Sequence, residues 1–145
     1  MAMERNNMTY AELAHFDDSL TRCTREPRFL ERFCALFFAS SDEVLQKFSQ
    51  TDVQKQRRVL QASLYMVMLA AADSPKSAVH LAPLATLHSQ AHLDIPPHLY
   101  DLWLDCLVQA VTECDHQWTP ATETVWRSMM ANGLAFMKAR YHPQA

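Results

Sequence analysis

The stretch LAPLATLHSQAHLDIPPHLYDLWLDCL, residues 81–107, contains the features that decide the fold. Its first half repeats apolar residues at helical spacing and places one imidazole, His88, four residues after Leu84. Residues 94–97, Asp-Ile-Pro-Pro, then interrupt the chain and start a second helix. The inner face of that second helix carries Tyr100, Trp103, Leu104, Leu107 and Val111. The stretch therefore predicts a short helix with an imidazole on its apolar stripe, followed by a long amphipathic helix.

The rest of the chain continues this helical pattern. Thr9 and Glu12 form a capping box before a helix that ends ahead of Pro27, and Pro27 is expected to open the next helix, about 27–40. Further helices are predicted at about 42–48, 52–72 and 76–91, then from 97 to about 114, and from Pro120 to about Tyr141. On the last helix the expected core face consists of Trp126, Met129, Met130, Gly133, Leu134 and Met137. About seven helices of unequal length are not the plan of a regular four-helix bundle.

Composition agrees with a single all-α domain over residues 1–145, with a flexible N-terminus at 1–8. Of the 145 residues, 49% are hydrophobic and 20% charged, and there is one Gly. Sheet proteins of this length use more glycine in their turns. The net charge of −3 without a basic block argues against nucleic-acid binding. The longest apolar run, 64–72, is too short to span a membrane.

The four cysteines lie within apolar helical patterns, at positions 23, 34, 106 and 114. They form no CxxC pair, which excludes a zinc ribbon or a thioredoxin-type motif. We expect packed, reduced thiols and a cytoplasmic protein.

Two polar side chains stand out on the apolar faces. Gln56 lies among apolar residues of the expected helix at 52–72, and His88 lies on the stripe described above. A polar group in such a place costs free energy unless it is satisfied. For an imidazole the partner is either a backbone carbonyl one turn back or a metal ion.

The order of these features resembles the bacterial single-domain globins. The segments that carry the resemblance are FLERFCALFFASSDEVLQKF (29–48), TDVQKQRRVLQASL (51–64), residues 81–107 and VWRSMMANGLAFM (125–137). Together they cover nearly the whole chain. The resemblance implies the globin fold, a three-over-three helical sandwich, and haem b as the cofactor.

The resemblance assigns roles to individual residues. His88 matches the proximal histidine that binds the haem iron, and Leu84 matches the apolar residue one turn before it. Gln56 matches the distal residue that faces a bound gas, and Leu60 the apolar residue over the gas site. Phe48 matches the phenylalanine that packs on the haem face, and Tyr100 and Trp103 fall on the helix that lines the inner edge of the pocket. A neutral imidazole whose second nitrogen donates to a carbonyl suits haem iron.

His92 and Cys34 each allow two interpretations. His92, one turn after His88, is a competing axial ligand, but at the helix end it is better suited to solvent or to a haem propionate. The HxxxH spacing lacks the glutamate of a zinc metalloprotease motif. Cys34 stands where many relatives have a tyrosine that donates to bound oxygen. A thiol is a weaker donor, so the resemblance predicts faster dioxygen release; the alternative is a small core residue.

Three functions follow as alternatives. The first is reversible binding of a diatomic gas, O2, NO or CO, for storage, scavenging or sensing, with a separate signalling partner if it senses. The second is a haem enzyme that consumes NO or peroxide with an external reductase. The third is a haem-free interaction module. The presence of His88, Gln56 and Phe48 argues against it, because a chain without haem has no chemical need for that set. A homodimer through the last two helices stays open.

Overall fold

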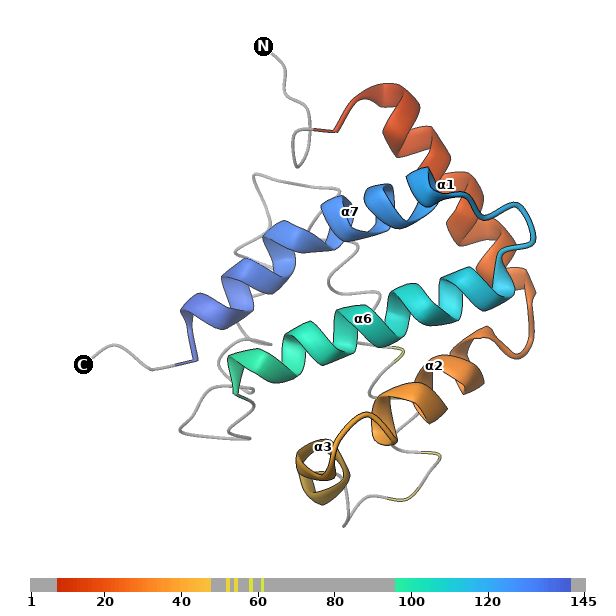
Figure 1. Ribbon diagram of the computed structural model, residues 1–145. Helices are drawn as coiled ribbons and strands as arrows, with labels where there is room; N and C mark the ends of the chain where they lie inside the picture. Colours follow the sequence, from red (N-terminus) through yellow and green to blue (C-terminus); the bar gives the residue numbers. More distant parts are fainter. Residues whose placement is uncertain are drawn as a thin grey trace.

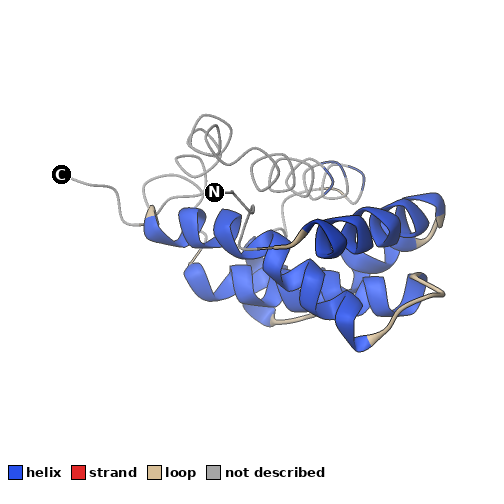
Figure 2. Cartoon of the chain, turned by 90° about the horizontal axis from the view of Figure 1, so that it is seen from above, coloured by secondary structure: helices blue, strands red, loops and turns tan. Residues whose placement is uncertain are grey.

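The computed structural model describes residues 8–47, 52, 54, 58, 61 and 96–141. Every regular element in these ranges is a helix (Figure 2). In chain order they are α1 (Tyr10–Arg25), α2 (Phe29–Phe38), α3 (Asp42–Lys47), α6 (Pro97–Cys114) and α7 (Pro120–Ala139). The predicted all-α class is confirmed. The helices expected at 52–72 and 76–91 lie outside the described residues except at isolated positions.

Local capping explains where the first and last helices begin. At α1, Thr9 Oγ1 accepts from the Glu12 backbone N–H over 3.1 Å, and the Glu12 carboxylate accepts from the Thr9 N–H over 2.9 Å. This is the capping box that the sequence predicts. At α7, Thr122 Oγ1 accepts from the Thr119 N–H over 3.0 Å, and Pro120 occupies the first turn. The helix ends at Ala139, two residues before the expected end.

The start of α2 differs from the prediction. Pro27 does not open the helix, which begins at Phe29. The residue before a proline is restricted to extended conformations, and Glu26 has φ −84° and ψ 114°. Pro27 and Arg28 (φ −90°, ψ −2°) then form a type I turn, closed by the Phe29 N–H donating to Glu26 O over 3.0 Å. The proline is therefore used in the turn between α1 and α2.

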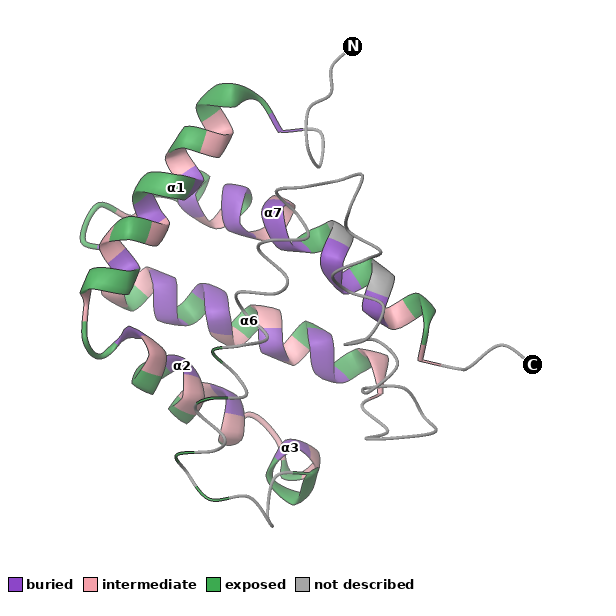
Figure 3. Ribbon diagram, turned by 180° about the vertical axis from the view of Figure 1, so that it is seen from behind, coloured by how far each residue is buried: buried purple, intermediate pink, exposed green. Residues whose placement is uncertain are grey.

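The helices pack around α6, which lies between α2 and α7, while α1 crosses α7 near the C-terminal end of α6 (Figure 1). Buried residues line the faces that meet at the centre (Figure 3). Trp126 of α7 contacts Phe16 of α1 edge to face, with ring centroids 4.7 Å apart. The predicted core face of α7 is confirmed, since all six of its residues are buried. On α6, Leu104 is only partly buried, and the rest of the predicted inner face is buried.

No helix in the described ranges combines the length and apolar character needed to cross a membrane.

Candidate functional site

The structure describes three of the nine residues that the sequence assigns to the site. These are Cys34 on α2 and Tyr100 and Trp103 on α6. The other six lie outside the described residues: Phe48, Gln56, Leu60, Leu84, His88 and His92. Within the described ranges, no group of three or more His, Cys, Asp or Glu side chains is arranged to hold a metal ion. The described part of the site is therefore a wall formed by α2 and α6.

The α6 side of this wall consists of two large aromatic residues one helical turn apart. Tyr100 is 7% exposed and Trp103 is 6% exposed, so both belong to the hydrophobic core. Burial raises the pKa of the Tyr100 phenol well above its ordinary value, because the phenolate is poorly solvated there. The phenol is therefore neutral at physiological pH, and this side of the wall carries no charge.

The α2 side meets α6 through aromatic contacts. The Phe33 ring packs edge to face against Trp103, with centroids 5.7 Å apart and planes at 72°. Phe37, one turn later, is also buried. Cys34 follows Phe33 and is partly buried against the core, and it forms no disulfide. Phe33 and Phe37 are buried and Cys34 packs against the same core, so this side of α2 is hydrophobic.

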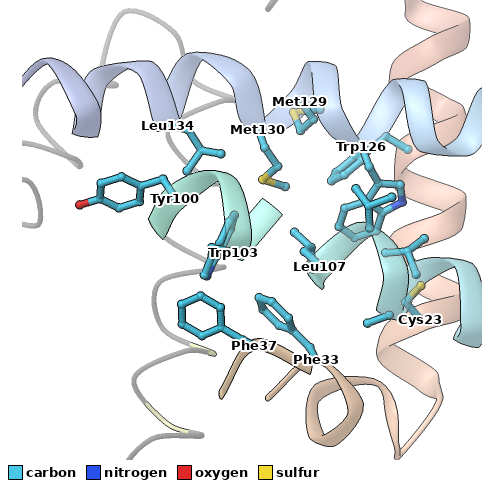
Figure 4. Packing of buried hydrophobic residues seen from close by; sticks show 14 of the residues in the cluster. Cys23, Phe33, Phe37, Tyr100, Trp103, Leu107, Trp126, Met129, Met130 and Leu134 are labelled. Carbon is cyan, nitrogen blue, oxygen red and sulfur yellow. The ribbon is translucent and has the colours of Figure 1, made fainter. Parts of the chain in front are cut away.

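Residual exposure is unequal along the core. Trp126 and Leu107 have no exposed surface, whereas Phe37, Tyr100 and Trp103 keep 5–7%. In Figure 4 Phe37, Tyr100 and Trp103 lie toward one end of the cluster, and Trp126 and Cys23 lie at the other. All five side chains are more than nine-tenths buried, so they belong to one continuous core.

The indole nitrogens of the described tryptophans differ in their hydrogen bonding. Trp126 Nε1 donates to Ser19 Oγ over 2.9 Å in the buried core. Trp118, at the turn between α6 and α7, has an enclosed Nε1 without an acceptor in the described structure. A buried indole N–H normally has an acceptor, so Trp118 is the exception among the described tryptophans.

A buried polar cluster at the α1 end was missed by the sequence analysis. Asp115, only 2% exposed, accepts from Ser19 Oγ, from the Arg22 guanidinium and from the Gln117 backbone N–H. The signal in the sequence is Ser19 itself, which lies three residues after Phe16 and four before Cys23 on the apolar face of α1. Its position predicts a polar partner, but not which one.

The comparisons with known proteins identify the family. A family model described as Globin matches residues 33–137. The crystal structure of a protein from Pseudomonas aeruginosa PAO1, described as structurally highly homologous to a human hemoglobin, is 37% identical in sequence to this chain. The match covers 90% of this chain and 98% of that chain, with a TM-score of 0.80. No curated protein matches.

These matches confirm the globin fold and the resemblance to bacterial globins that the sequence predicts. The family match extends over more than half of the chain and contains all nine predicted site positions. The chain belongs to the globin family, whose members typically bind haem.

Proposed function

We propose that this globin binds haem through His88 and reversibly binds a diatomic gas, O2, NO or CO, on the opposite side of the haem. The observation that carries the proposal is the family match over residues 33–137, which includes His88, Gln56 and Phe48. A chain without haem has no chemical need for that combination. Haem, when bound, supplies the iron that takes the gas.

The described wall fits this cofactor. A flat macrocycle needs a large apolar surface, and Phe33, Phe37, Tyr100 and Trp103 provide aromatic faces where two helices meet. The residues that would hold the haem are His88 at the iron and Phe48, Leu60, Leu84, Tyr100 and Trp103 around it.

The other residues of the proposed site have separate tasks. Gln56 would offer an amide N–H to the gas, since an amide donates without binding iron well. His92 would lie toward solvent or a propionate. Cys34 would contribute a small, weakly donating side chain on the α2 side.

Cytoplasmic residence is part of the proposal. Cys23 is fully buried and the other three cysteines are partly buried, and none is in a disulfide. Such packing suits a reducing compartment. Interaction with an external reductase or a signalling partner, and formation of a homodimer, remain predictions from the sequence.

The absorbance spectrum of the haem-reconstituted protein tests the proposal. We expect an intense Soret band that His88→Ala abolishes and the matched control His92→Ala retains. Circular dichroism of each variant checks that the helices are intact. Absence of the band from the unsubstituted protein would overturn the proposed function, and its loss in His92→Ala alone would move the iron ligand to position 92.

A further inference from the structure

We draw no further inference here: the strongest candidate, the exposed strip of small residues Ala121, Thr124, Ala131 and Ala135 along α7, carries nothing because nothing in the described structure shows what covers it.

Discussion

The Ser19 hydroxyl donates to Asp115 Oδ2 over 2.6 Å and so joins α1 to the residue that ends α6. The Ser19 hydroxyl oxygen also accepts a hydrogen bond from Trp126 Nε1 on α7, so this one hydroxyl group connects three helices. Arg22 completes the cluster with two hydrogen bonds to the Asp115 carboxylate. Because the carboxylate is buried, its partners must compensate for the loss of water.

Removing this carboxylate is expected to destabilise the fold strongly. Asp115→Ala leaves the Ser19 hydroxyl and the Arg22 guanidinium without their acceptor, and we expect a loss of about 2–4 kcal/mol in the free energy of unfolding. Urea unfolding followed by circular dichroism measures it. The control Asp101→Ala removes an exposed carboxylate bonded to Lys138 and should cost less than about 1 kcal/mol. Equal losses in the two variants would contradict a structural role for the buried cluster.

The same carboxylate makes stability depend on pH. Burial of Asp115 disfavours its charged form, but hydrogen bonds from Arg22, Ser19 and the Gln117 backbone outweigh burial and lower its pKa. Its contribution is therefore complete above the ordinary Asp pKa of about 3.9 and is lost as the pH falls through the folded-state pKa. Asp115→Asn should show a shallower fall in the free energy of unfolding below about pH 5. Glu113, whose pKa is lowered by Arg32 and Gln109, remains in both proteins and sets the background slope. Parallel pH profiles would contradict this assignment.

Phe33 is expected to be among the most sensitive core positions. It is fully buried and packs on Trp103, so Phe33→Ala leaves a cavity between α2 and α6. Such truncations cost about 3–5 kcal/mol. Leu45→Ala, at a residue that is 57% exposed, is the control and should change stability by less than about 0.5 kcal/mol. Thermal or urea unfolding measures the change in the free energy of unfolding. A loss below about 1 kcal/mol for Phe33→Ala would show that its contact with Trp103 is dispensable.

Cys34→Tyr is expected to slow dioxygen release. A phenol at this position adds a stronger donor than the thiol, and one such hydrogen bond corresponds to roughly a tenfold longer residence of the ligand. Stopped-flow dissociation measures the rate, with Cys34→Phe as the control that adds the ring without the hydroxyl. A rate that does not fall below that of the control would count against a donor role at position 34.

The capping box at Thr9 predicts a smaller effect. Thr9→Ala removes the hydroxyl that accepts from the Glu12 N–H, and loss of an N-cap typically costs about 1 kcal/mol. Thr24→Ala, also an exposed threonine of α1, should cost less because its hydroxyl bonds only to a carbonyl within the helix. The difference in urea midpoint between the two variants tests the cap.

Much of the helical plan follows from the sequence because it depends on local interactions. Thr9 with Glu12 and Thr119 with Pro120 start helices through groups within four residues of each other, and helical periodicity marks the core face of α7. The start of α2 was missed because Pro27 suits both a first helical turn and a type I turn. Only the backbone of Glu26 decides between them.

The candidate site is predictable to a different extent. Order and residue type along the chain, compared with a known family, nominated all nine positions, and the described structure tests the surroundings of Cys34, Tyr100 and Trp103. Their burial agrees with a place in the core. The edge-to-face contact of Trp103 with Phe33 could not be predicted, because it depends on how α2 and α6 cross.

The sequence by itself determined that the chain is all-helical, where most described helices begin, and which residues are candidates for the haem. Tertiary structure alone decided that Ser19 bonds to Asp115, 96 positions away, and that Phe33 packs on Trp103. The physical reason is how far apart along the sequence the interacting residues lie. Caps and amphipathic faces are fixed by neighbours within a turn or two, whereas these contacts depend on how the helices cross.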